Sequence, residues 1–188
     1  MKMGRGQMDK KKSSGNKPKP KKQIEQIAKS LIEPELSALG YEIWDLEYYN
    51  DGAEWLLEIT IENPSGAPIS FEDCDRATKA VCPILDRHDP IEGSYCLAVG
   101  SPGLDRQLKT AAQMDRYKGK EVKVGLFAKN ETAGAKSFVG ILKAVGDAEN
   151  SFEFELVPGG EAISLEKKQI AQICAHDEIK EIKEIKTQ

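Results

Sequence analysis

Residues 99–106 read Val99-Gly100-Ser101-Pro102-Gly103-Leu104-Asp105-Arg106. Val99 is the last residue of a short apolar run, residues 95–99, which is typical of a buried strand. Pro102 fixes φ at about −65° and Gly103 tolerates a positive φ, so the pair suits the two central positions of a type II turn. Asp105 and Arg106 follow at a point where a helix can begin, with the carboxylate near its positive N-terminal end. The stretch therefore predicts a fixed exit from a strand that joins two domains.

The segment that ends at Gly40 has the pattern of an amphipathic helix. Its apolar residues recur every three or four positions between Ile24 and Leu39. Pro34 interrupts this pattern, so we expect a kink or a restart of the helix near that residue. Gly40 predicts the C-terminal stop.

Two strands are expected next, at residues 45–48 and 54–62. Apolar and polar side chains alternate in both, which is typical of an antiparallel sheet that is covered on one side. The sequence Asn50-Asp51-Gly52 predicts the connecting turn. On the polar side, Glu54, Glu58 and Glu62 form either an ordinary solvated face or an acidic surface for a basic partner.

A second helix is expected after Ser70. Ser70 and Asp73 form a variant of the capping box, with Asp in place of the preferred Glu, and Pro83 is expected to bend or end the helix. With the strand at residues 95–99, the order is helix–strand–strand–helix–strand. This order predicts an α+β, sandwich-like N-terminal domain over residues 23–110.

The following segment, residues 111–175, predicts a small β domain. A short helical stretch at 111–117 precedes several alternating strands, near residues 122–126, 138–142, 152–156 and 163–170. Gly140 is the natural bend point within one of them. Short strands at this density fit a small, strongly bent barrel.

The N-terminal segment, residues 1–22, is a basic arm. It carries nine lysines and arginines against Asp9 alone, a net charge of +8 that leaves −12 for the rest of a chain whose total is −4. Its composition predicts disorder. Its lysines either contact phosphates or only keep the chain in solution. The candidates for phosphate contact are Lys10, Lys11, Lys12, Lys19, Lys21 and Lys22.

The C-terminal segment, residues 176–188, repeats Glu-Ile-Lys in steps of three, a period that fits neither an amphipathic helix nor a strand. We expect a charged, disordered tail. No stretch approaches the ~18 apolar residues needed to span a membrane, and the N-terminus lacks the apolar region of a secretory signal. These features predict a cytoplasmic protein that does not bind a membrane.

The sequence gives little support for a catalytic site or a metal site. A nucleophile elbow around Ser101 requires glycine at position 99, where Val99 stands, and the two histidines, His88 and His176, lie in charged, loop-like stretches. The four cysteines are widely and irregularly spaced, which favours buried thiols over a zinc site. We therefore expect no catalytic residue, no metal and no cofactor.

The stretch at residues 99–106 resembles the signature of the ribosome maturation factor RimP family, usually Ser-Ser-Pro-Gly-Leu-Asp-Arg-Pro-Leu. Gly100 replaces the first serine here, and Gln107 replaces the second proline. The resemblance implies that the barrel is SH3-like and related to the Sm fold. It also implies a non-enzymatic assembly factor that binds immature small (30S) ribosomal subunits transiently. Its implied partners are subunit RNA and the ribosomal protein near the decoding centre.

Under this resemblance Ser101, Asp105 and Arg106 are candidates for ribosome contact, because arginine suits a bidentate phosphate contact. The alternative is local: Pro102 and Gly103 shape the turn, and the two charged residues cap or pair nearby. The resemblance implies a monomer without a small-molecule substrate. The rival function is a generic RNA- or protein-binding module with an Sm-like barrel that has no part in ribosome assembly.

Overall fold

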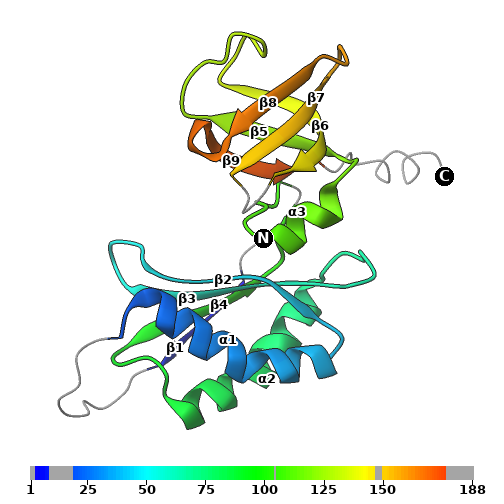
Figure 1. Ribbon diagram of the computed structural model, residues 1–188. Helices are drawn as coiled ribbons and strands as arrows, with labels where there is room; N and C mark the ends of the chain where they lie inside the picture. Colours follow the sequence, from blue (N-terminus) through cyan, green and yellow to red (C-terminus); the bar gives the residue numbers. More distant parts are fainter. Residues whose placement is uncertain (1–2, 9–18, 104, 147–149, 177–188) are drawn as a thin grey trace. The chain divides into compact units, whose positions relative to one another are not determined.

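The computed structural model describes residues 3–8, for their backbone only, together with 19–103, 105–146 and 150–176 (Figure 1). The chain divides into two compact units, Met1–Pro102 and Gly103–Gln188. The division falls within residues 99–106, before the boundary at residue 110 that the sequence predicted. Both units combine helices and sheets, so the expected α+β class is confirmed in this coarse form.

The first unit has two layers, a mixed sheet and two helices. Its elements are β1 (Met3–Met8), α1 (Lys21–Ala38), β2 (Glu42–Asn50), β3 (Trp55–Glu62), α2 (Phe71–His88) and β4 (Tyr95–Gly100). The sheet order is β1-β4-β3-β2, in which β3 and β4 are parallel and the other neighbours antiparallel. Figure 1 shows α1 and α2 on the same face of this sheet. After β1, the order is the expected helix–strand–strand–helix–strand.

The core of the first unit lies between its two layers. The alternation in β3 puts Leu57, Ile59 and Ile61 on the helix-facing side, where all three are fully buried. Ile32 from α1 and Val81 from α2 pack into the same cluster. Burying one such side chain stabilises the fold by ~1.5–3 kcal/mol, so this face fixes the register of the strand.

Helix α1 ends in a Schellman motif. Gly40 has a φ of 87°, its N–H donates to the Ser37 carbonyl (3.0 Å), and the N–H of Tyr41 donates to the Leu36 carbonyl (2.9 Å). The expected stop at Gly40 is confirmed. The helix runs through Pro34 without the restart that was one of the two expectations.

Parts of residues 1–22, expected to be disordered, belong to regular structure. Residues 3–8 form β1, paired with β4, and residues 21–22 open α1, so the expectation was wrong for these residues. Residues 3–8 are ordered by backbone pairing with β4. Residues 21–22 are ordered because α1 begins directly after Pro20. Residues 9–18 lie outside the described residues.

The second unit is a short helix followed by an antiparallel sheet. Its elements are α3 (Ala111–Tyr117), β5 (Glu121–Leu126), β6 (Ser137–Val145), β7 (Ser151–Val157), β8 (Ala162–Glu166), the 3₁₀ turn η2 (Lys167–Gln169) and β9 (Ile170–Ala175). The order is β8-β7-β6-β5-β9. In the described residues no ladder joins β8 to β9, so the sheet is not a closed barrel and the expected SH3-like barrel stays a prediction. In the expected tail, 176–188, only His176 is described.

Gly140 marks a close approach between β6 and β7. A Cβ atom added there lies 2.9 Å from the carbonyl oxygen of Glu155. Only glycine fits at that separation without moving backbone, which explains why the apolar stretch at residues 138–142 carries a glycine.

Candidate functional site

The stretch at residues 99–106 is extended rather than helical beyond its turn. Gly103 has a φ of 71°, the value that the second central position of a type II turn needs. The Arg106 carbonyl then accepts a hydrogen bond from the N–H of Ala175 (2.8 Å), and Leu108 donates to Ile173 (2.8 Å). The expected helix start at residues 105–106 was wrong, because the backbone there pairs with β9. The next helix, α3, begins at Ala111.

The residues predicted for ribosome contact belong to different units. Ser101 directly follows β4 in the first unit, whereas Asp105 and Arg106 lie in the second. Leu104 lies outside the described residues. The role of the three side chains in binding stays a prediction.

A serine–histidine pair does not form in the first unit. His88 ends α2, which leads into the beginning of β4, while Ser101 follows the other end of that strand. The strand alone spans about 20 Å, six residues at ~3.3 Å each, and among the described residues no hydrogen bond joins the two side chains. Among the described residues no group of three or more histidines, cysteines and carboxylates is placed to hold a metal ion.

The acidic side of β3 is engaged within the fold. The thiol of Cys96 donates to the Glu54 carboxylate (2.8 Å), and the Tyr49 hydroxyl donates to Glu58 (2.7 Å). Glu62 is buried. This side is therefore not the fully solvated face that one of the two readings of the sequence expected.

The described lysines of the basic arm gather near the start of α1. The Lys19 ammonium donates to the carbonyl of Pro90 (3.4 Å), and Lys21 is the first residue of the helix. Lys22 follows it and is exposed. Lys10, Lys11 and Lys12 lie outside the described residues.

Lys21 lies over an aromatic pair, Tyr48 and Trp55. The sequence pattern predicted these two residues only as parts of strands. The ammonium lies 5.2 Å from the ring centroid of Trp55, within the range of a cation–π interaction. The Trp55 and Tyr48 rings stack, with centroids 4.8 Å apart and planes 17° from parallel. Tyr48 is buried in the core, whereas Trp55 is 37% exposed. The alternation in β3 predicted a core residue at position 55, but Trp55 is the first residue of the strand and stays partly exposed.

A pocket of about 200 Å³ opens beside this pair. It is lined by Lys19, Lys21, Ile24, Tyr48, Trp55, Pro90 and Glu92. We call it the Trp55 pocket. It combines an aromatic face with two lysines and one carboxylate, so it is suited to binding and has no nucleophile–base pair for catalysis.

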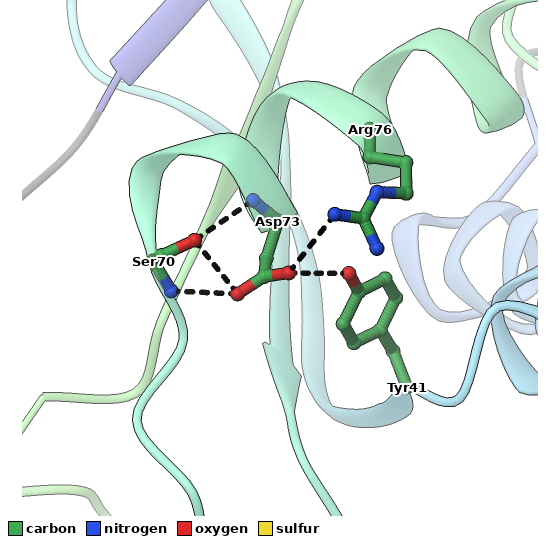
Figure 2. A network of polar contacts seen from close by, with 4 residues as sticks. All are labelled: Tyr41, Ser70, Asp73 and Arg76. Atoms are coloured by element: carbon green, nitrogen blue, oxygen red, sulfur yellow. Dashed lines mark hydrogen bonds and ion pairs between the residues drawn. The ribbon is translucent and has the colours of Figure 1, made fainter.

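A polar network ties the two helices of the first unit to each other (Figure 2). The hydroxyl of Tyr41 donates to one carboxylate oxygen of Asp73 (2.6 Å), and the backbone N–H of Ser70 donates to the other (2.9 Å). The Ser70 hydroxyl accepts from the Asp73 N–H, which completes the expected capping box. Arg76 lies 3.7 Å from the same carboxylate.

This network keeps Asp73 ionised. The hydrogen bond from Tyr41, followed by those from Ser70, lowers the pKa of Asp73 to about 2. Burial, together with the bond to Asp73, raises the pKa of the Tyr41 hydroxyl above its ordinary value. A carboxylate this acidic is a poor proton acceptor at neutral pH, so the network serves the fold.

Fold and site together define a mixed α+β protein of two units, with a basic and aromatic pocket on the first. Residues 31–105 match the family model described as the RimP N-terminal domain. This region, from the middle of α1 through Asp105, belongs to the ribosome maturation factor RimP family, and the resemblance seen in residues 99–106 is confirmed.

Among solved structures, the chain is similar to one chain of the structure titled "Crystal Structure of MjSpt4:Spt5 complex conformation A". The two are 12% identical, the TM-score is 0.23, and the similarity covers 81% of this chain and 92% of that chain. A TM-score this low carries no argument about fold or function. Separately, none of the helices in the described residues is long and apolar enough to cross a membrane.

Proposed function

We propose that this chain is a non-enzymatic assembly factor that binds immature small (30S) ribosomal subunits transiently in the cytoplasm. The match of residues 31–105 to the RimP N-terminal domain is the observation that carries the proposal. The matched region contains three strands of the sheet, β2, β3 and β4, together with α2 and the turn at Pro102-Gly103. The proposed partners are subunit RNA and the ribosomal protein near the decoding centre, and the chain acts as a monomer without a cofactor.

The second unit is proposed to be the SH3-like, Sm-related domain of such a factor. The strand order β8-β7-β6-β5-β9 supports this. Strands β5 to β8 form an antiparallel meander, and the last strand, β9, returns to pair with the first, β5. The 3₁₀ turn η2 makes that return between β8 and β9. Gly140, where β6 and β7 approach closely, is compatible with the strong bend that a small barrel requires.

Ser101, Asp105 and Arg106 are the proposed ribosome contacts within residues 99–106. Asp105 is exposed, and the guanidinium of Arg106 is the group best suited to a bidentate phosphate contact. The arm lysines would add contacts that weaken as the salt concentration rises.

Co-sedimentation with ribosomal particles on sucrose gradients tests the proposal. We expect the full chain to migrate with free small subunits, more with immature than with mature ones, and little with assembled ribosomes. Absence from the small-subunit fractions would contradict the proposal. Equal recovery on every RNA-containing particle would favour the generic binding module instead.

A further inference from the structure

We propose that the Trp55 pocket binds one nucleotide of single-stranded RNA, with the base against the aromatic pair and its phosphate beside Lys21. This inference deepens the proposed function and rests on it for the source of the RNA, an unpaired strand of the immature small subunit. It assigns a binding site to residues outside the stretch 99–106.

The aromatic pair supplies a rigid platform. Tyr48 is held from two sides, since its ring lies in the core and its backbone N–H donates to the Glu25 carboxylate (3.0 Å). Stacking on Tyr48 fixes the orientation of Trp55, whose ring stays 37% exposed. The Lys21 ammonium lies over the Trp55 ring, so a base that stacks there displaces this flexible side chain, which then turns to the phosphate. Every base has a face that can stack, and a tryptophan already held in place loses little side-chain freedom on binding it.

The electrostatics favour a negatively charged guest. Among the residues that line the pocket, Lys19 and Lys21 are positively charged and Glu92 carries the one carboxylate. The first turn of α1 carries no acidic residue, and its N-cap is Pro20, whose side chain makes no capping hydrogen bond. The positive end of the helix dipole therefore adds to the lysines. A basic peptide would meet like charge here.

Size and charge distribution together favour a strand over a small cofactor. A volume of about 200 Å³ lies below the ~300–1,000 Å³ typical of sites for drug-sized ligands, so it accommodates one ring system. Beyond the residues that line the pocket, Lys22 follows Lys21 in the first turn of α1 and is exposed. A polyanion that places one base in the pocket can contact Lys22 as well, whereas a free nucleotide contacts only the lysines that line the pocket.

The proposal is tested with a short single-stranded oligoribonucleotide and the full chain. The chain has two tryptophans, of which Trp44 is buried. We expect the oligonucleotide to quench the emission of the wild type and not that of Trp55→Phe, in which only Trp44 reports. Trp55→Leu should weaken binding at least ~5-fold, the low end of what one stacked base contributes.

Lys21→Gln should weaken binding and reduce its dependence on salt. Lys29→Gln is the matched control, because Lys29 is an exposed lysine of the same helix, 3.9 Å from Glu33. Both lysine variants leave the core untouched, and far-UV circular dichroism with a urea midpoint verifies folding for all variants. The same sequence as a duplex, and a nucleoside monophosphate, are each expected to bind more weakly than the single strand.

Unchanged oligonucleotide binding by Trp55→Leu would overturn the inference, and so would equal affinity for the nucleoside monophosphate. Co-sedimentation of the wild type separates this failure from failure of the proposed function. If the wild type migrates with immature subunits while Trp55→Leu binds RNA normally, the pocket assignment alone is wrong. If the wild type does not migrate with subunits, the proposed function is wrong, and quenching still decides the pocket.

Discussion

The hydroxyl of Tyr41 donates a 2.6 Å hydrogen bond to the carboxylate of Asp73, 32 positions further along the chain. Tyr41 is the residue that the Schellman motif places directly after α1, and Asp73 belongs to the capping box that starts α2. One bond therefore joins the end of one helix to the beginning of the other.

This relationship predicts a specific loss of stability in acid. The pKa of Asp73 is about 2 in the fold, against 3.8 ordinarily, so the folded chain binds fewer protons than the unfolded chain between these values. The stabilisation from Asp73 is complete above about pH 4 and is lost as the pH falls toward 2. Urea unfolding followed from pH 6 to pH 2 should show this decline, and a wild-type stability that does not fall over this range would contradict it.

Tyr41→Phe should destabilise the chain by about 1–2 kcal/mol at neutral pH, because it removes a hydrogen bond to a charged group. The difference from wild type should shrink as Asp73 becomes protonated. Asp75→Asn is the control, since Asp75 lies on the same helix in an exposed pair with Lys79 (2.7 Å) and should cost less than about 0.5 kcal/mol. Equal losses for the two variants would contradict the role assigned to Tyr41.

Gly40→Ala tests the helix end that positions Tyr41. A Cβ meets no atom within 4 Å there, so the cost comes from the φ of 87° alone and should be about 1 kcal/mol. Gly100→Ala has equal space and no positive φ, so it should change the free energy of unfolding little. Denaturant titration compares the two, and equal effects would mean that the backbone conformation at Gly40 is not limiting.

The sequence predicted what local patterns determine. The alternation in β3, the capping box at Ser70 and the stop at Gly40 each depend on residues within a few positions of one another, and all were predicted. The bond from Tyr41 to Asp73 and the stacking of Trp55 on Tyr48 depend on tertiary packing, to which short-range patterns do not respond. A helix start was expected at residues 105–106 because the distant pairing of this segment with β9 has no local signal.

Gly140→Ala should destabilise the second unit by about 1–3 kcal/mol, because the new Cβ would press on the backbone oxygen of Glu155. Gly125→Ala, in the neighbouring strand β5, is the control. Its Cβ would meet only the Gln172 side chain, at 3.1 Å, and that flexible chain can move aside. Thermal unfolding distinguishes the two, and a stable Gly140→Ala would argue against a tight bend in β6.

Replacing Lys10, Lys11 and Lys12 by glutamine should reduce the salt dependence of RNA binding. Each phosphate contact with a single strand contributes about 0.7 to the slope of log affinity against log salt, so the slope should fall by up to ~2. Fluorescence anisotropy at several salt concentrations measures it. An unchanged slope would mean that these lysines make no phosphate contact and only keep the chain in solution.

The most direct test of the central claim compares two affinities at the same salt concentration. One is for purified immature small subunits, and the other is for protein-free RNA of the same subunit. A dedicated assembly factor recognises the particle, so we predict binding to the immature subunit at least ~10-fold tighter, a difference of about 1.4 kcal/mol. Equal affinity for the particle and the bare RNA would contradict the account and leave a general RNA-binding protein in its place.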